Sequence, residues 1–156
     1  MMKIRILQYM ICLGVLLVLG CAARAEKWIY YDTALTGDMY YDKSSIKKAD
    51  NGVTSVRTKN ILNEDGQTKY HAILKILNKA PANPASLHYS ITLMELNYAS
   101  KEIRDVSLSF YDEKNQTVYT SPRNDAGAWN AVQSGTIGEK LFNLILPRLR
   151  DFKGMS

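Results

Sequence analysis

Residues 87–98 read Leu87-His88-Tyr89-Ser90-Ile91-Thr92-Leu93-Met94-Glu95-Leu96-Asn97-Tyr98, and this stretch decides the fold. Successive side chains of an extended strand point to opposite faces. The apolar side chains of this stretch occupy both faces: Leu87, Tyr89, Ile91 and Leu93 on one, and Met94, Leu96 and Tyr98 on the other. A strand that is apolar on both faces is typical of the centre of a sheet. We therefore expect a central strand, covered on both sides for part of its length.

Five other segments have the β-branched and aromatic composition of strands, and turn signals such as Asp50-Asn51-Gly52 separate them. In residues 53–62, Arg, Lys and Thr side chains alternate with apolar ones, of which Val56 and Ile61 are the clearest. This alternation indicates that one face of the sheet is open to solvent. The five segments are Lys27 to Asp32, Met39 to Tyr41, Val53 to Leu62, Ile103 to Tyr111 and Thr117 to Ser121.

Two segments have the spacing of amphipathic helices. Tyr70, Ile73, Leu74 and Leu77 stand at i, i+3, i+4 and i+7, which is the apolar stripe of a helix. A strand would place Ile73 and Leu77 opposite Leu74 and Ile76, and this alternative stays open.

Near the C-terminus, Thr136 and Glu139 have the spacing of a capping box. The helix that they open carries an apolar stripe of Ile137, Leu141, Leu144 and Ile145. It should stop or kink at Pro147, which cannot continue the hydrogen-bond ladder. The fold class that we expect is α+β, an antiparallel sheet of about six strands with a mid-chain helix and a C-terminal helix packed on it.

Residues 1–25 have the pattern of an export signal. Lys3 and Arg5 precede an apolar run of residues 6–19, and Ala23-Arg24-Ala25 has the small-x-small pattern of a cleavage site. The run is shorter than the roughly 20 residues that a membrane-spanning helix needs. We expect cleavage after Ala25, a single mature domain over residues 26–156, and a location in the periplasm or at the outer membrane.

Cys21 offers an alternative route, because Val18-Leu19-Gly20-Cys21 resembles a lipidation site. Leu19 is large for its place in such a site, and the aromatic Trp28 follows without a polar tether, so we favour Ala25. Contact with a membrane is expected only through a lipid at Cys21. Cys12 and Cys21 are the only cysteines of the chain, so the mature domain has no disulfide.

The charge of the chain excludes nucleic acid as an expected partner. The net charge is +5, from 20 basic and 15 acidic residues. Lys3, Arg5 and Arg24 leave with the signal and no acidic residue does, so 17 basic residues face 15 acidic ones. A nearly neutral domain lacks the electrostatic basis for binding phosphate backbones.

The residues of the mature domain show no catalytic or cofactor-binding pattern. His71 and His88 have no motif around them, and no nucleophile elbow, phosphate-binding glycine loop or His-Glu-x-x-His occurs. Asp38 and Asp42 bracket Met-Tyr-Tyr, but they supply too few oxygens for Ca²⁺ and suit a turn better. We therefore expect a protein that is not an enzyme and has no metal and no cofactor.

Tyrosines gather near the start of the mature domain. In each adjacent pair of a strand, one side chain points inward and the other outward. Exposed tyrosines suit interfaces, because they are apolar and yet form hydrogen bonds. The candidate contact surface, for a protein ligand or for a second copy of the chain, is Tyr30, Tyr31, Tyr40 and Tyr41.

An ordered set of segments spans residues 28–146. It comprises Trp28…Gly37-Asp38-x-Tyr40-Tyr41-Asp42-x-Ser44-Ser45-Ile46, Leu93-x-Glu95-Leu96-Asn97, Arg104…Val106-Ser107…Tyr111-Asp112-x-Lys114, Trp129 and Gly135-Thr136-x-Gly138-Glu139-x-Leu141. In this order and spacing, the segments resemble the surface-adhesin protein E family of small exported bacterial proteins. The resemblance implies an antiparallel sheet with helices packed on it. The namesake of the family is a lipid-anchored outer-membrane adhesin that binds host extracellular-matrix proteins.

The chain departs from the family at two places. Many relatives have a Cys directly after the Glu-x-Asn/Asp of the long strand and a second Cys near the end of the last helix. Tyr98 and Leu146 stand at these places here. The resemblance therefore implies a lost disulfide, and we expect the side chains of Tyr98 and Leu146 to touch.

The function that we expect is that of an exported, non-enzymatic binding protein of the protein E type, with no ligand assigned. The alternative is a structural cell-envelope protein that dimerises through its sheet and binds no host molecule.

Overall fold

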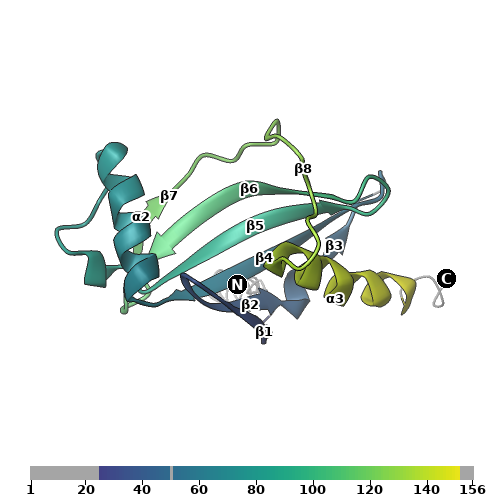
Figure 1. Cartoon of the computed structure of the whole chain (residues 1–156), viewed down its shortest axis with the longest axis horizontal. Coiled ribbons are helices and arrows are strands. Elements are labelled where there is room, and N and C mark those ends of the chain that lie inside the picture. The colour runs from purple at the N-terminus through teal and green to yellow at the C-terminus, as the bar shows by residue number, and fades with distance from the viewer. Residues whose placement is uncertain (1–24, 50, 152–156) are drawn as a thin grey trace, which may run out of the picture.

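The computed structural model describes residues 25–49 and 51–151, the last five of these by their backbone only. Except for Ala25, the expected export signal, with Cys21, lies outside the described residues. Every described strand and helix lies between Trp28 and Asp151 (Figure 1). The mature domain that we expect thus contains the whole described fold.

Eight strands form one antiparallel sheet. Six main strands follow the order β1-β2-β4-β5-β6-β7, while β3 pairs with β4 and β8 pairs with β6. The strands are β1 (Trp28–Ala34), β2 (Gly37–Asp42), β3 (Lys47–Lys48), β4 (Val53–Leu62), β5 (Tyr89–Asn97), β6 (Glu102–Tyr111), β7 (Thr117–Thr120) and β8 (Asn130–Ala131). The expected α+β class with six main strands is confirmed, and β5 is central as predicted.

Two α-helices, α2 (Glu64–Ile76) and α3 (Ile137–Asp151), cover one face of the sheet (Figure 1). Two short 3-10 helices, η1 (Lys43–Ser45) and η2 (Pro84–Ser86), lie in connections. Residues paired across neighbouring strands share a face. Tyr41 pairs with Thr58 and Val56 pairs with Met94, so these side chains belong to the covered face.

The core under α3 is the larger of two hydrophobic clusters. Its fully buried members come from β2, β4, β5 and α3: Tyr41, Val56, Leu96, Leu141, Phe142 and Ile145. Of the predicted helical stripe, Leu141 and Ile145 are in this core, whereas Leu144 is 40% exposed. The helix therefore packs along a narrower stripe than its sequence indicates.

The core under α2 is smaller. Leu62, Leu74, Leu87 and Phe110 are its buried members, and the ring of Tyr70 lies 5.1 Å from that of Phe110. The segment is a helix, so the strand alternative is wrong. Only part of the predicted stripe faces the sheet, because Ile73 and Leu77 are 43% and 49% exposed.

Neither α2 nor α3 lies on the other face of the sheet, since both pack on the clusters of the covered face. β5 is nevertheless covered on both sides at its start, as expected for part of its length, because the adjacent Tyr89 and Ser90 are 8% and 3% exposed. Arg57 pairs with Leu93 and Lys59 with Ile91. The long stems of the basic side chains thus lie beside the half-buried apolar ones, and such stems cover apolar surface well. Ile61 also belongs to this face, since β4 buries only alternate residues.

The start of α2 is fixed against the β1–β2 turn. The side chain of Asn63 accepts from the Gly66 amide at 2.9 Å, and its amide group donates to the carbonyl of Leu35 at 3.0 Å. A Cβ at Gly66 would stand 2.2 Å from the carbonyl oxygen of Thr36. Only glycine allows the helix to approach this turn so closely.

The predicted capping box opens α3. The Thr136 hydroxyl accepts from the Glu139 amide at 3.2 Å, while the Glu139 carboxylate accepts from the amide of Gly135 at 2.8 Å. Of the two outcomes expected at Pro147, the stop is wrong, because α3 continues to Asp151, while the kink stays a prediction. A proline within a helix removes one amide donor, and the hydrogen-bonded turns on either side keep the helix continuous.

Tyr98 lies against α3, as the lost-disulfide idea requires. Its ring is 4.3 Å from that of Phe142, and its hydroxyl is 3.5 Å from the Phe142 carbonyl oxygen. Leu146 is half-buried one helical turn further on. The contact between Tyr98 and Leu146 themselves stays a prediction.

Candidate functional site

The face of the sheet opposite the helices, here called the open face, holds the candidate site. It presents the side chains that alternate with the core residues of β1, β2, β4 and β5. The residues that define it are Trp28, Tyr30, Tyr40, Arg57, Lys59, Tyr89, Leu93 and Tyr111.

The structure divides the four predicted contact tyrosines between the two faces. Tyr30 is 53% exposed, and its ring meets that of Tyr40 edge-on at 5.6 Å on the open face. Tyr41 is 1% exposed in the core, with Tyr31 packed against the same cluster. Burial also raises the pKa of Tyr31. The inward and outward alternation is present, while the contact role of these tyrosines stays a prediction.

A row of aromatic and basic side chains crosses the open face. The Lys59 ammonium lies 4.4 Å from the centre of the Trp28 ring and 4.8 Å from that of Tyr89. The Tyr89 ring stacks on Tyr111 with 4.8 Å between centres and 12° between planes. Burial lowers the pKa of Lys59. The row links β1, β4, β5 and β6 through these ring and ammonium contacts, although Tyr89 itself is only 8% exposed.

Asp42 fixes the geometry at one end of this face. Its side chain is fully buried, and Oδ2 accepts from Arg57 at 2.6 Å. Oδ1 accepts from the Lys27 amide at 3.0 Å and from the amide and hydroxyl of Ser44 at 2.9 and 2.5 Å. Burial by itself would raise the pKa of Asp42, but the donors of Ser44, Lys27 and Arg57 together lower it to about 2.

Arg57 connects this buried carboxylate to the aromatic row. Its guanidinium also meets the Glu26 carboxylate at 3.0 Å and lies 5.7 Å from the centre of the Trp28 ring. The Trp28 indole donates to the second oxygen of Glu26 at 2.9 Å. Arg57 and Trp28 are therefore held in one orientation before any ligand arrives.

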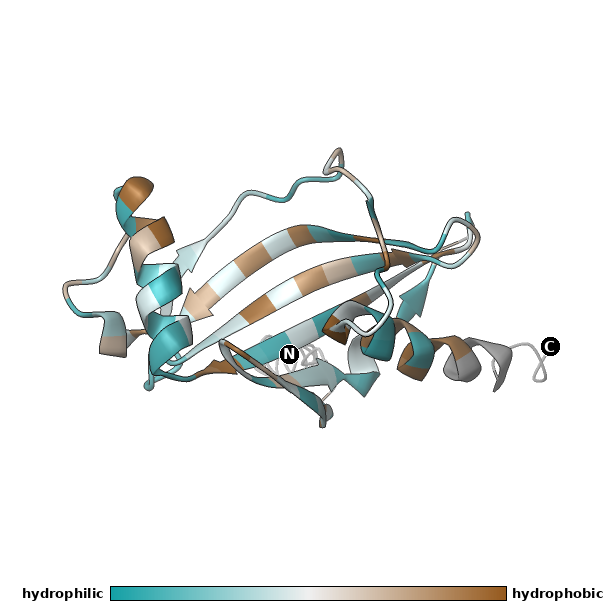
Figure 2. Cartoon of the chain, in the orientation of Figure 1, coloured by the Kyte–Doolittle hydropathy of each residue, from teal (hydrophilic) through white to brown (hydrophobic). Residues whose placement is uncertain are grey.

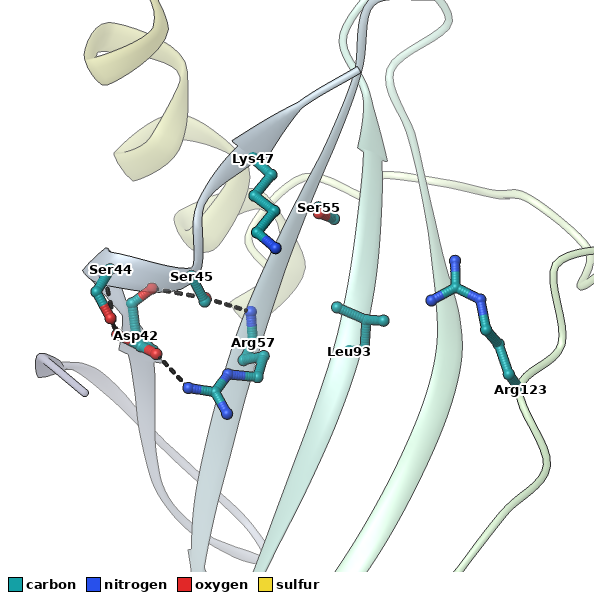
Figure 3. A pocket seen from close by; sticks show the side chains of 8 residues that line it. All are labelled: Asp42, Ser44, Ser45, Lys47, Ser55, Arg57, Leu93 and Arg123. Atoms are coloured by element: carbon teal, nitrogen blue, oxygen red, sulfur yellow. Dashed lines mark hydrogen bonds and ion pairs between the residues drawn. The ribbon is translucent and has the colours of Figure 1, made fainter. Parts of the chain in front are cut away.

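A groove of about 560 Å³ lies beside Arg57 on the open face. In Figure 3, Asp42, Ser45 and Arg57 form one hydrogen-bonded wall, and Arg123 stands at the opposite wall. Its lining comprises Asp42, Ser44, Ser45, Lys47, Ser55, Arg57, Leu93 and Arg123. The lining includes three basic side chains and one acidic one. Both arginines also pair with carboxylates, Arg57 with Asp42 and Glu26 and Arg123 with Asp125.

A second arginine fastens the long loop after β7 to the sheet. Arg104 donates to one oxygen of Glu95 from two nitrogens, at 2.9 and 2.6 Å, and also to the carbonyl of Asp125 at 2.7 Å. Its guanidinium lies 4.4 Å from the centre of the Trp129 ring. These contacts fix the loop that carries Arg123 to the rim of the groove.

The histidines and the acidic pair occupy structural positions. The Nε2 atom of His71 is 2.9 Å from the carbonyl oxygen of Pro81, and the His88 ring meets Tyr89 edge-on at 6.0 Å. Asp38 accepts from the hydroxyl of Thr33 at 2.7 Å. Within residues 25–49 and 51–151, no group of three His, Cys, Asp or Glu residues could hold a metal ion.

The comparison with known protein families identifies the chain. Residues 28–145 match the family described as surface-adhesin protein E, and this match covers all described strands, α2, and α3 as far as Ile145. The chain belongs to the surface-adhesin protein E family. This is a family of surface adhesins, generally non-enzymatic, and such adhesins are exported to the cell surface. No curated protein matches the chain significantly.

In the described part of the chain, none of the helices has both the length and the apolar character needed to cross a membrane.

Sequence reasoning missed the Trp28–Lys59–Tyr89–Tyr111 row and the Asp42–Arg57 pair. Their residues are far apart in the sequence, and the register of β1, β2, β4, β5 and β6 brings them together.

Proposed function

We propose that this chain is an exported surface adhesin that binds a protein ligand through the open face. The observation that carries the proposal is that the open face, which neither α2 nor α3 covers, presents Trp28, Tyr30 and Tyr40 together with a groove at Arg57. Membership of the adhesin family supports the binding role.

The chemistry of this face suits protein recognition. Trp, Tyr and Arg are the residues most enriched among those that dominate binding energy at interfaces. Tyr30 offers a half-exposed ring together with a hydroxyl, which is 2.9 Å from the hydroxyl of Thr33. Arg123 adds a charged group at the rim, with a side chain that is 56% exposed. The surface can therefore bury apolar area and still satisfy polar groups.

Pre-organisation strengthens the proposal. A side chain that is ordered before binding loses less conformational entropy when the ligand arrives. Asp42 and Glu26 hold Arg57, and the sheet holds Trp28 beside Lys59. A ligand with an acidic group next to an aromatic or aliphatic one would match the groove and the aromatic row together.

Binding to immobilised extracellular-matrix proteins tests the proposal, with denatured chain as the background. Tyr30→Ala and Arg123→Ala alter exposed side chains of the open face, and each should weaken binding about fivefold or more. Ile76→Ser is the matched control, because it alters an exposed side chain of α2 on the covered face. Unchanged binding in both open-face variants, or an equal loss in the control, would contradict the proposal.

Light scattering separates the adhesin from a structural, self-associating envelope protein. We expect a monomer whose open face remains available. A stable dimer that Tyr30→Ala dissociates, together with no binding to matrix proteins, would favour the structural role instead.

We also propose cleavage after Ala25, with lipidation of Cys21 as the alternative route. The apolar run and the small-x-small site of residues 1–25 support this. The intact mass of the exported protein decides between a chain that begins at Glu26 and one that begins with a lipid-modified Cys21.

A further inference from the structure

The C-terminal end of α2 carries a cluster of exposed apolar side chains, here called the α2 tip, formed by Ile73, Ile76 and Leu77. Their exposed fractions are 43%, 81% and 49%. Ile76 and Leu77 follow Ile73 by three and four residues, and residues at these spacings are neighbours on a helix surface. The three side chains therefore form one patch. Isolated exposed apolar residues are ordinary, whereas a contiguous group at a projecting end indicates a contact surface.

The fold holds the α2 tip out in a fixed position. Leu74 is 1% exposed in the core under the helix, and Tyr70 packs on Phe110 one turn earlier. The helix ends at Ile76 with Leu77 as its C-cap, after which Asn78 takes a left-handed conformation with φ of 55°. His71 meets the carbonyl of Pro81 and secures the chain that follows. In Figure 2 the free end of α2 is coloured hydrophobic and stands beyond the strands.

The surroundings of the tip are basic. Lys69, Lys75 and Lys79 are exposed, and no Asp or Glu occurs between residues 66 and 94. None of the three lysines forms an ion pair with a described residue. The nearest acidic residues of the helix, Glu64 and Asp65, lie in its first turn, about 16 Å along the axis from Ile76.

Exposed aliphatic side chains bordered by lysines match the surface of an anionic bilayer. The aliphatic groups enter the boundary between headgroups and acyl chains, while the ammonium groups meet lipid phosphates. A stable protein interface uses roughly 20–30 residues on each side, and three apolar side chains fall far short of that. We propose that the α2 tip docks the folded domain on a membrane that contains anionic phospholipid.

This docking is peripheral and reversible. It needs no lipid at Cys21, and it uses the covered side of the molecule at α2, so the open face stays free for a ligand. Three aliphatic groups and three lysines give weak binding by themselves, and its strength should fall as salt screens the lysines.

Vesicle co-sedimentation tests the proposal with a chain that begins at Glu26, which retains all described strands and helices and lacks the apolar leader. The probes are vesicles of phosphatidylcholine alone and vesicles of phosphatidylcholine mixed with phosphatidylglycerol. The variants are Ile76→Ser in the tip and Lys75→Gln beside it. Leu35→Ser is the matched control, because Leu35 is also 81% exposed but lies in the β1–β2 turn near Asp32 and Asp38.

The expected result is binding to the anionic vesicles that exceeds binding to the neutral ones and weakens with salt. Ile76→Ser should reduce the partition coefficient about tenfold, as for loss of one buried aliphatic side chain. Lys75→Gln should reduce it about fivefold, and Leu35→Ser should leave it unchanged. Circular dichroism confirms that each variant is folded, which is expected because all three positions are exposed.

Three results would overturn the proposal. The first is equal binding by the original chain and Ile76→Ser, and the second is an equal loss in Leu35→Ser. The third is self-association that Ile76→Ser abolishes without any vesicle binding, which would assign the tip to a second copy of the chain. Tyr30→Ala should keep vesicle binding, so failure of this proposal and failure of the adhesin proposal are distinguishable.

Discussion

The two ends of the covered sheet face differ in how completely their helices are buried. At the α3 end, Leu141 and Ile145 are enclosed by side chains of three strands, and the Asp42 network orders the opposite side of the same strands. At the α2 end, Leu74 is buried but Ile73, Ile76 and Leu77 are not. One helix mainly completes the core, while the other also leaves apolar side chains exposed.

The largest expected effect separates two isoleucines of these helices. Ile145→Ala removes a side chain that is fully buried and should lower the free energy of unfolding by about 3–4 kcal/mol, since the enclosed site cannot collapse fully. Ile76→Ala alters a side chain that is 81% exposed and should change it by no more than about 0.5 kcal/mol. Denaturant unfolding of both variants measures the two losses in the free energy of unfolding. Similar losses would show that the two helices do not differ in this way.

Two glycines near the helix starts give the next effect. Gly66→Ala places a Cβ against the carbonyl of Thr36 and should destabilise the protein by about 1–3 kcal/mol, because backbone atoms must move. At Gly138 the nearest atom to an added Cβ is the Thr136 hydroxyl oxygen at 3.5 Å. Gly138→Ala should therefore stabilise the protein by about 0.5–1 kcal/mol through helix propensity. Thermal unfolding tests the opposite signs.

Acid should weaken the α3 end through Asp42. The pKa of Asp42 is lowered from the ordinary 3.8 to about 2. Its contribution to the free energy of unfolding is therefore complete above pH about 4 and is lost as the pH falls toward 2. We expect this loss to be about 1–2 kcal/mol after allowance for solvent screening. Unfolding measured from neutral to acid pH should show a shallower acid decline in Asp42→Asn than in the original chain. Parallel declines would show that Asp42 has an ordinary pKa.

The smallest effect distinguishes the two helix caps. Thr136→Ala removes a local hydroxyl cap and should cost about 1 kcal/mol. Asn63→Ala removes a cap and also the hydrogen bond to the Leu35 carbonyl, so its loss should be larger by about 0.5–1 kcal/mol. Equal losses in chemical denaturation would mean that the bond to Leu35 adds nothing to the attachment of α2.

Much of the fold could be predicted from local sequence. The period of two in residues 53–62 and 87–98 predicted β4 and β5, and the Thr136–Glu139 spacing predicted the start of α3, because strand alternation and capping depend on neighbours in the chain. The same local reasoning predicted a stop or a kink at Pro147, and the stop does not occur. The helix hydrogen bonds on either side of the proline outweigh the single donor that it lacks.

The candidate site was less accessible to prediction. The four tyrosines were candidates because they form adjacent pairs in the sequence. The alternation of side chains along a strand does not by itself decide which member of a pair faces the core. Register decides this, and it places Tyr41 inward with Val56 and Tyr30 outward with Tyr40. Register also brings Asp42 to Arg57 from 15 positions away in the sequence.

The sequence by itself determined the six main strands and the two α-helices, the family and the approximate neutrality of residues 26–156, because periodicity, caps and charge are properties of the chain. Tertiary structure alone decided that both helices share one face of the sheet, that Trp28, Lys59 and Tyr89 meet on the other, and that Ile76 stays exposed although its helix is docked. Those outcomes depend on strand register and on how far a sheet extends beneath each helix. Both are set by contacts between distant segments, for which no local pattern exists.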